Sequence, residues 1–306
     1  MAKSKYLPSS VVRVPTYGEL EQYAGAFAAG HLNLLLLCGL PGLGKSQCFR
    51  RALHGKVCWL DGNASPFVIY TLAYAHRNQP LVLDDVDGLY QDRRGIRLLK
   101  ALCQTDPVKT VSWLTAVTTD ELSGLPRRFA TTSPVAIIAN QWQQLNADVA
   151  ALEDRGHCLE FTPSTLEVHR QAAAWYWDQQ IFDFVAAHLH WIKQHSLRTY
   201  VLAWELKKAG LDWRQAVLSR CLTGTLLEVA KLKANLSFAS EEERVRAFVA
   251  AGLGCRATFF NHAKKLPPPQ VPSAIKLVHS SPPEQVKASV DFLDVLRRRF
   301  GPLGSG

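Results

Sequence analysis

Residues 39–46 read Gly-Leu-Pro-Gly-Leu-Gly-Lys-Ser, and this stretch decides the fold. It matches the complete pattern G-x-x-x-x-G-K-[ST], in which each fixed position meets a need of a bound triphosphate. Glycines lack a Cβ, so the backbone can turn tightly and bring its N–H groups against phosphate oxygens. Lys45 supplies a positive charge for the β- and γ-phosphates, and the Ser46 hydroxyl can ligate Mg²⁺.

The flanks of this loop support the same interpretation. Residues 34–38 are a short apolar run typical of a buried strand, and residues 47–55 are expected to form a helix. A strand before the loop and a helix after it are the required context, and a helix N-terminus attracts anions. The alternative is a chance glycine turn before a helix. We assign nucleotide binding to Gly39, Pro41, Gly42, Leu43, Gly44, Lys45, Ser46 and Gln47.

An acidic pair follows another apolar run, residues 81–83. A phosphate loop needs a carboxylate at the end of a buried strand to hold Mg²⁺. We expect Asp84 to take this role, together with Ser46, and Asp85 to polarise the attacking water. Asp87 is the alternative for the second role, although it can equally cap the turn that it forms with Gly88.

Two further side chains complete the expected catalytic set. Asn140 follows the apolar run 135–139, and an amide at the tip of a neighbouring strand can hold a water against the γ-phosphate. Arg155 is expected to neutralise transition-state charge, on the nucleotide of a neighbouring subunit. The alternative for Arg155 is a surface arginine paired with Glu153 or Asp154.

Strand and helix patterns alternate through the first half of the chain. Continuous apolar runs that alternate with helices predict a parallel sheet covered on both faces, here an α/β domain over residues 1–162. Residues 1–15 are expected to be a loose arm. Strands are expected at 34–38, 56–60, 81–83, 134–139 and 158–161, with a short extended piece at 111–114. Helices are expected at 17–30, 47–55, 66–77, 94–105 and 143–155.

The pattern becomes helical after Pro163. A capping box, Ser164-x-x-Glu167, opens an expected all-α domain over residues 163–265. Residues 266–306 are rich in Pro and Ser at first and basic later, as in a linker and tail, and 301–306 resemble a cloning remnant. No winged-helix or helix-turn-helix signature is recognisable. Helices are expected at 164–179, 181–194, 197–209, 212–235 and 241–253, with Gly210 and Gly224 as candidate breaks.

The composition is that of a soluble globular protein. The chain has 306 residues, of which 47% are hydrophobic, enough for one large or two modest domains. No apolar run approaches the ~20 residues that cross a bilayer, and the N-terminus lacks an apolar signal region. We therefore expect a cytoplasmic protein without a membrane partner. The seven cysteines contain no C-x-x-C pair, which argues against a zinc site or a disulfide framework.

The positive charge is concentrated in the second half of the chain. The formal net charge is +9, and residues 1–162 carry 16 Lys/Arg against 14 Asp/Glu, whereas residues 163–306 carry 19 against 12. A basic domain favours a polyanion partner, nucleic acid first. The alternative is solubilising surface charge, because no dense basic run occurs.

Four motifs together resemble the AAA+ ATPases. Residues 39–46, 81–85, 136–140 and 151–155 look like the Walker A, Walker B, sensor-1 and arginine-finger elements, in matching order and spacing over residues 33–162. The resemblance implies a P-loop domain followed by a helical lid. It also implies ATP and Mg²⁺ as cofactors and a homo-oligomer, either a hexamer or a helical assembly.

The same resemblance suggests residues outside these motifs. Arg198, at the start of a lid helix, is similar to a sensor-2 arginine that reaches the γ-phosphate, and its alternative is a solvated helix-start residue. In AAA+ rings the region between Walker B and sensor 1 commonly faces the pore or a subunit interface. Lys109, Arg127 and Arg128 are therefore candidates for nucleic-acid or inter-subunit contact, with loop charges in water as the alternative.

One departure from the family pattern bears on function. Many AAA+ proteins end Walker B with Asp-Glu, whereas Asp84-Asp85 is similar to bacterial replication initiators, helicase loaders and some transposition ATPases. With the basic second half, this favours an ATPase that remodels or loads onto nucleic acid in replication, transposition, or phage or plasmid biology. The alternatives are a chaperone-like remodeller of a protein substrate and a nucleotide switch with little turnover, since Asp is one methylene shorter than Glu.

Overall fold

A computed structural model describes residues 10–266, except 54–56, 63, 87–88, 90–91, 115–123, 143–151, 153, 177, 193–194 and 236. The chain divides into two compact units, Met1–Ser164 and Thr165–Gly306. The division lies beside the change of sequence pattern after Pro163. Within the described residues, no helix is both long enough and apolar enough to span a membrane.

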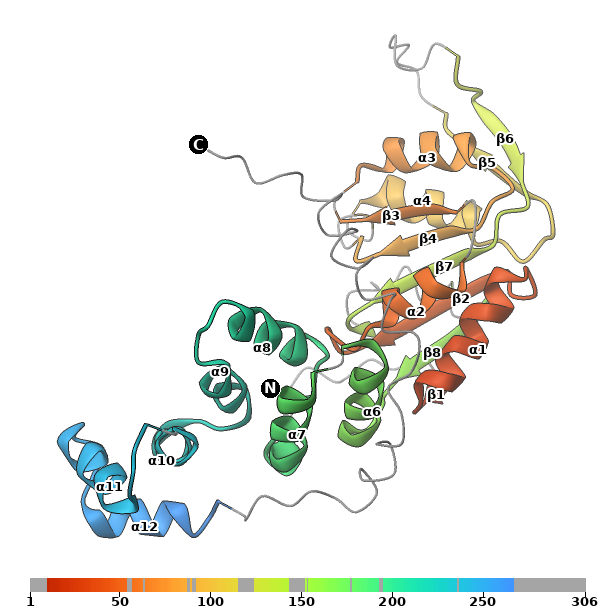
Figure 1. Ribbon diagram of the computed structural model, residues 1–306. Helices are drawn as coiled ribbons and strands as arrows, with labels where there is room; N and C mark the ends of the chain where they lie inside the picture. The colour runs from red at the N-terminus through yellow and green to blue at the C-terminus, as the bar shows by residue number, and fades with distance from the viewer. Residues whose placement is uncertain are drawn as a thin grey trace. The chain divides into compact units, whose positions relative to one another are not determined.

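The first unit is built on a six-stranded parallel sheet, so the expected α/β fold is confirmed (Figure 1). The strand order is β1-β8-β2-β7-β4-β3, and every neighbouring pair is parallel. The strands are β1 (Val11–Val14), β2 (Leu34–Gly39), β3 (Cys58–Asp61), β4 (Leu81–Asp84), β7 (Val135–Ala139) and β8 (His157–Phe161).

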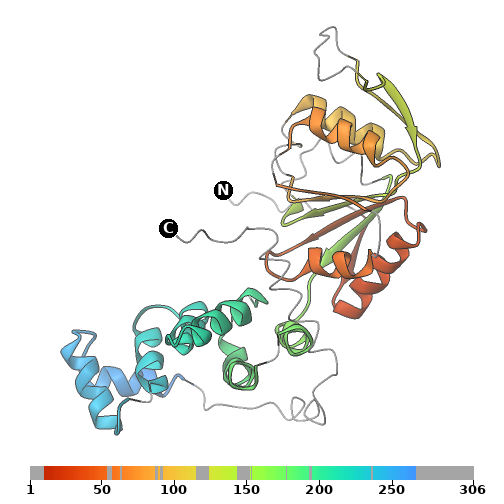
Figure 2. The same cartoon turned by 45° about the horizontal axis from the view of Figure 1, so that its top comes forward.

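Helices cover both faces of this sheet. Figure 2 shows α3 and α4 on one side of the strands and α1 and α2 on the other. Every residue of the central strands β2 and β7 is buried, as their continuous apolar runs predict. The four helices are α1 (Tyr17–Ala28), α2 (Lys45–Ala52), α3 (Pro66–Ala75) and α4 (Arg93–Leu102).

Side-chain caps define several helix starts. Thr16 accepts a hydrogen bond from the Glu19 N–H at the start of α1, and Ser65 accepts one from Val68 at the start of α3. Asp92 caps α4 in the same way. Such caps satisfy backbone N–H groups that a helix cannot pair internally.

Two expectations for the first unit are wrong. Residues 11–14, expected as part of a loose arm, form the edge strand β1, which pairs in parallel with β8. The region between β4 and β7 contains an antiparallel ribbon of β5 (Lys109–Ser112) and β6 (Arg128–Thr131), where only a short extended piece was expected. Most of the helix expected at 143–155 lies outside the described residues.

The second unit is helical throughout its described part. The expected helix 212–235 is divided before Gly224, one of its candidate breaks, which has a φ of +62°. α12 lies inside the expected all-α domain but was not expected as a separate helix. The helices are α6 (Thr165–Trp175), α7 (Gln179–His188), the 3-10 turn η5 (Leu189–Trp191), α8 (Arg198–Lys208), α9 (Trp213–Cys221), α10 (Gly224–Ala234), α11 (Glu241–Ala250) and α12 (Arg256–Ala263).

Candidate functional site

Three adjacent strands bring the predicted site residues to one edge of the sheet. β7 lies between β2 and β4, with Leu37 opposite Ile138 and Leu83 opposite Ile137. Because all three strands are parallel, their carboxyl ends meet at the same edge, where ligands bind in open α/β sheets. The glycine loop begins at the last residue of β2, Asp84 is the last residue of β4 with Asp85 directly after it, and Asn140 follows β7.

The glycine loop takes the conformation that its sequence predicts. Gly42 and Gly44 have φ values of +80° and +76°, in the left-handed region that favours glycine. A Cβ at Gly39 would lie 2.7 Å from the Phe161 carbonyl oxygen, so this position also needs glycine. Helix α2 begins at Lys45, two residues earlier than expected. The loop therefore leads directly into a helix N-terminus, where anions are favoured.

Lys45 is held inside the loop, with 5% of the residue exposed. Its Nζ donates to the carbonyl oxygens of Gly39, at 2.7 Å, and Leu40, at 3.0 Å. A third hydrogen bond reaches the Asn140 Oδ1 at 3.1 Å. The ammonium group is thus aimed at the loop interior by neutral oxygens, which a phosphate could replace with a stronger, anionic acceptor.

Ser46 and Asp84 form a second contact across the sheet edge. The Ser46 hydroxyl donates to Asp84 Oδ1 at 3.0 Å. Burial raises the pKa of the Asp84 carboxyl above its ordinary value, and the charge of Asp85 adds to the rise. The hydrogen bond from Ser46 and the positive charges of Arg50 and Lys45 lower that pKa. A cation bound beside this buried carboxylate would stabilise its ionised form and so offset the effect of burial on the pKa.

Asn140 also contacts the second acid. Its Nδ2 donates to Asp85 Oδ1 at 2.8 Å, so one amide bridges Lys45 and Asp85. Asp85 is exposed and has a φ of +52°, a left-handed conformation that Asp and Asn tolerate better than other non-glycine residues. This turn of the backbone follows β4 and points the carboxylate toward the amide.

The donor set fits Mg²⁺ together with a triphosphate. The described residues hold no cluster of three or more His, Cys, Asp or Glu side chains suited to a metal ion. Mg²⁺ needs no such cluster, because it binds one or two protein oxygens and takes its other ligands from water and phosphate. Ser46 and Asp84 supply those oxygens, and the positive-φ glycines leave the backbone open to phosphate.

Two predicted residues lie apart from this group. Arg155 is half-buried, and its Nη1 donates to the Lys100 carbonyl oxygen at 3.2 Å. No ion pair with Asp154 is found, and Glu153 lies outside the described residues, as does Asp87. Arg198 is exposed at the start of α8 in the second unit. Its reach toward the nucleotide stays a prediction.

The basic candidates between β4 and β7 divide into two kinds. Lys109 is fully buried and donates to the Ser133 carbonyl oxygen at 2.6 Å, so the prediction that it contacts nucleic acid or another subunit is wrong. Burial lowers the pKa of its ammonium group. It alternates with Val111 on the inner side of β5, a period-two pattern that could have revealed this. Arg127 and Arg128 are exposed on the ribbon, where Arg128 Nε donates to Ser112 Oγ.

Two residues of the site were missed by sequence reasoning. The Tyr17 hydroxyl, from α1, donates to the Leu43 carbonyl oxygen at 2.8 Å and so holds the backbone of the glycine loop in place. Arg50 pairs with Asp61 at 3.3 Å and lies over the Trp59 ring at 3.9 Å. The signal for Arg50 is its i+4 spacing from Ser46, which places both on one helix face. No local signal connects Tyr17 to the loop.

Comparison with known proteins adds little to this geometry. No protein-family model matches the chain. A stretch of 120 residues is 28% identical to the "Uncharacterized 36.7 kDa protein in nrdC-mobD intergenic region" of Enterobacteria phage T4. The similarity covers 36% of this chain and 37% of the phage protein, so the chain spans little more than a third of this relative.

Proposed function

We propose that the chain is an AAA+ ATPase that binds Mg²⁺ and ATP at the edge of its parallel sheet and hydrolyses the bond between the β- and γ-phosphates. One observation carries the proposal. Lys45, Asn140 and Asp85 are joined by hydrogen bonds, beside the Ser46–Asp84 contact, although they come from three separate strand ends. A phosphate loop, a metal-binding acid and a polar side chain on the intervening strand are the parts that phosphoryl transfer requires.

Each residue has a distinct task in this proposal. The loop N–H groups and Lys45 bind the phosphates, and Ser46 and Asp84 hold the metal. Mg²⁺ would neutralise charge on the phosphate oxygens. Asp85 orients the attacking water and accepts its proton.

Asn140 connects nucleotide binding to Asp85. Its Oδ1 accepts from Lys45 while its Nδ2 donates to Asp85. When Lys45 turns to a phosphate, the amide loses its cationic donor and becomes available to the attacking water. The Asn140 amide therefore couples binding of the γ-phosphate by Lys45 to the position of Asp85, the acid that activates water.

The remaining parts of the proposal concern assembly and substrate. The helical second unit acts as a lid, the protein is a cytoplasmic oligomer, and its work is remodelling of or loading onto nucleic acid. Residues 163–306 carry 19 Lys/Arg against 12 Asp/Glu, and this net positive charge supports the nucleic-acid role. The Asp84-Asp85 ending supports it as well. The second candidate is remodelling of a protein substrate, in which that charge has no binding role.

An ATPase assay with and without single-stranded and duplex DNA tests the proposal. We expect Mg²⁺-dependent hydrolysis that DNA stimulates. Lys45→Ala should weaken ATP binding at least about tenfold, since a charge-assisted hydrogen bond is lost. Arg97→Ala, which removes an exposed cation of α4, is the matched control and should leave binding unchanged.

Each possible result distinguishes the candidates. Absence of ATP binding would refute the proposal. Binding without turnover would leave the nucleotide switch, and turnover that a protein partner stimulates but DNA does not would favour the protein remodeller.

A further inference from the structure

The last three helices of the described chain pack against one another within the second unit. α10, α11 and α12 contact one another in all three pairs (Figure 1). Their shared core consists of Val229, Val245, Phe248 and Phe259, with Leu253 and Phe260 among the residues packed against it. This burial holds α12 in a fixed position against the other two helices.

The turn from α11 to α12 depends on two glycines. Gly252 has a φ of +68° and donates to the Val249 carbonyl oxygen at 3.0 Å, while Leu253 donates to Phe248 at 3.3 Å. These paired bonds form a Schellman motif, which ends a helix sharply and places an apolar residue after the glycine. Gly254 has a φ of +140°, and a Cβ there would lie 2.9 Å from the Thr258 side chain.

Five residues, 251–255, separate the end of α11 from the start of α12, and three of them lie between the two helix caps. Ala251 is the C-cap of α11 and Cys255 the N-cap of α12, with residues 252–254 between them. Two helices joined by a glycine-containing turn of three or four residues are the elements of a helix-turn-helix, in which the second helix enters the DNA major groove. α10 supplies the third, supporting helix.

α12 presents one face to the core and the opposite face outward. Phe259 is fully buried and meets the Phe248 ring edge-on at 5.4 Å. Ala257, Asn261 and Lys264 are exposed, and their spacing along the helix places them opposite Phe259. The outward face is thus narrow and polar, with a small residue near its N-terminal end.

These side chains suit base edges and phosphates. An Asn amide can pair with the N6 and N7 atoms of adenine, and an Ala methyl can contact the thymine methyl group. Lys264 and Lys265 are exposed at the end of α12, and Arg246 is exposed on α11. Cations at the ends and flanks of a recognition helix bind the DNA backbone and fix its register.

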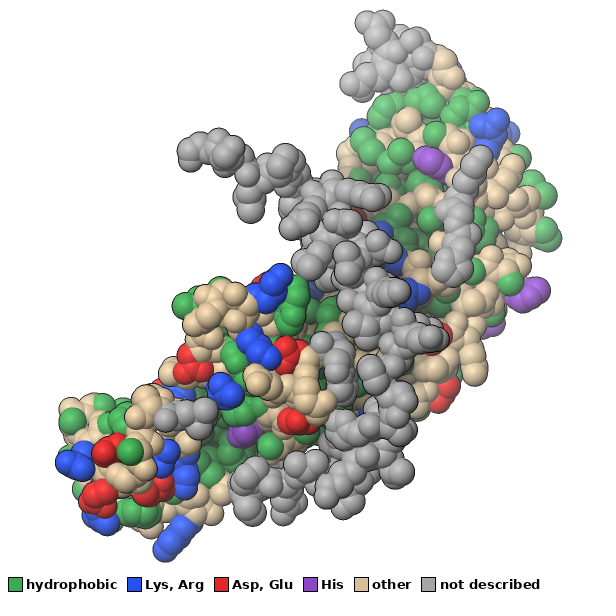
Figure 3. All heavy atoms as spheres, in the orientation of Figure 1, with side chains coloured by type: hydrophobic (Ala, Val, Ile, Leu, Met, Phe, Trp, Pro, Cys, Tyr) green, Lys and Arg blue, Asp and Glu red, His purple; other side chains and the backbone are tan. Residues whose placement is uncertain are grey.

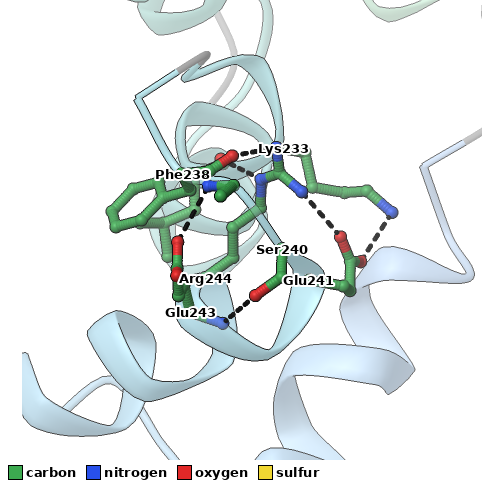
Figure 4. Close-up of polar contacts among 8 residues, drawn as sticks. Lys233, Phe238, Ser240, Glu241, Glu243 and Arg244 are labelled. Carbon is green, nitrogen blue, oxygen red and sulfur yellow. Dashed lines mark hydrogen bonds and ion pairs between the residues drawn. The ribbon is translucent and has the colours of Figure 1, made fainter.

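The acidic residues of these three helices already form ion pairs or hydrogen bonds. Figure 4 shows Glu241 between Lys233 and Arg244, and Glu243 accepting from the backbone at the turn before α11. Glu242 pairs with Arg256. Within residues 224–266 there are seven Lys/Arg and four Asp/Glu. Among the described residues, Arg246, Lys264 and Lys265 form no ion pair, which leaves their charge for a polyanion.

The space-filling view shows both kinds of charge on this part of the chain. In Figure 3, Lys and Arg side chains lie around α11 and α12, with acidic side chains interspersed among them.

We propose that α10–α12 form a helix-turn-helix module whose recognition helix, α12, reads duplex DNA through Ala257, Asn261 and Lys264. This goes beyond the ATPase function, because it concerns a second site that requires neither ATP nor its hydrolysis. Lys265 and Arg246 contact the phosphates on either side of the groove.

Fluorescence anisotropy of the full-length chain, without nucleotide, tests the proposal. The probe is a pool of duplexes about 20 base pairs long, two helical turns, with randomised sequence. Lys264→Glu should lower the affinity about tenfold or more and reduce the slope of log affinity against log salt by about 1. Arg220→Glu makes the same charge change at an exposed residue of α9 and should leave the affinity within about twofold.

Selection of tight-binding sequences from the same pool tests base recognition. Asn261→Ala should lose about fivefold or more of the preference at one base pair while keeping backbone binding. Circular dichroism checks that every variant is folded. The proposal is overturned if duplex DNA does not bind, if single strands bind equally well, or if Lys264→Glu has no more effect than Arg220→Glu. ATP hydrolysis measured on the same samples tests the other proposal separately.

Discussion

At the scale of single residues, the Asn140 amide joins the two halves of the candidate site. A lysine can only donate hydrogen bonds and a carboxylate can only accept them, so the amide has one orientation that satisfies both Lys45 and Asp85. Replacement by an apolar residue would leave both charges without this partner. Asn140 is therefore a positioning residue as much as a contact for water.

Replacement of Asp85 separates nucleotide binding from turnover. Asp85→Asn keeps the size of the side chain, an oxygen for the Asn140 amide, and tolerance of the left-handed φ. It removes the base, so we expect kcat to fall on the order of 10²-fold or more while the Kd for ATP changes less than about threefold. Single-turnover hydrolysis and equilibrium nucleotide binding measure the two quantities.

The control for this change is Asp92→Asn. Asp92 caps α4, and Asn is an equally good capping residue, so turnover should be unaffected. Undiminished kcat in Asp85→Asn would show that Asp85 does not activate the water.

At the scale of elements, a buried polar cluster ties α6 to the start of α8. The Tyr200 hydroxyl is 2.7 Å from His169 Nδ1 and 2.9 Å from His195 Nε2. Burial, together with the charge of His195, lowers the pKa of His169 to about 3, and burial lowers that of His195 to about 4. His169 also stacks on Phe182 at 3.8 Å. Both imidazoles are therefore neutral in the folded protein at neutral pH.

Acid should destabilise the second unit through these histidines. Both pKa values lie below the ordinary 6.5, so the unfolded chain binds more protons than the folded chain between those values. Their contribution to stability is complete above pH 6.5 and is lost as the pH falls through about 4 for His195 and about 3 for His169.

Tyr200→Phe tests the cluster directly. The variant leaves two buried ring nitrogens without their hydroxyl partner, which should cost about 1–3 kcal/mol of unfolding free energy at neutral pH. Urea denaturation of the variant and the parent chain measures the difference. Tyr23→Phe, on α1 in the first unit, is the control and should stay within about 0.5 kcal/mol of the parent. Equal stability of Tyr200→Phe and the parent would contradict a role for the shared hydroxyl.

At the scale of the whole molecule, the proposal concerns assembly into an oligomer. If Arg155 acts on a neighbour's nucleotide, Arg155→Ala should lower kcat on the order of 10³-fold, as for other arginines that neutralise transition-state charge. A mixture of Arg155→Ala and Lys45→Ala subunits should then regain activity. In that mixture the first variant supplies intact nucleotide sites and the second supplies the arginine.

Two outcomes would contradict action between subunits. Mixed samples without regained activity would place Arg155 in its own subunit's site or in a structural role. Loss of the fold in Arg155→Ala, seen by thermal melting, would indicate that its hydrogen bond to the Lys100 carbonyl oxygen is its main contribution.

Sequence patterns predicted the parallel sheet and the positions of most elements, because strand and helix periodicities are local. They failed where long-range pairing decides the structure. The strand β1 is four residues long and gains its conformation from β8, almost 150 residues away. α12 is short and directly follows the glycine turn, so its apolar residues do not form a recognisable helical pattern in the sequence. Its packing through Phe259 on Phe248 shows that it is a separate helix.

The sequence by itself determined the glycine loop, its lysine and serine, and the acids that end β4. These depend on neighbouring residues, since a backbone turn and a strand end are fixed locally. Only the tertiary structure decided that β7 lies between β2 and β4, which brings Asn140 to Lys45 across 95 positions. It also buried Lys109 and aimed Tyr17 at the loop. Strand order and burial result from packing of the whole sheet, which no local window of sequence contains.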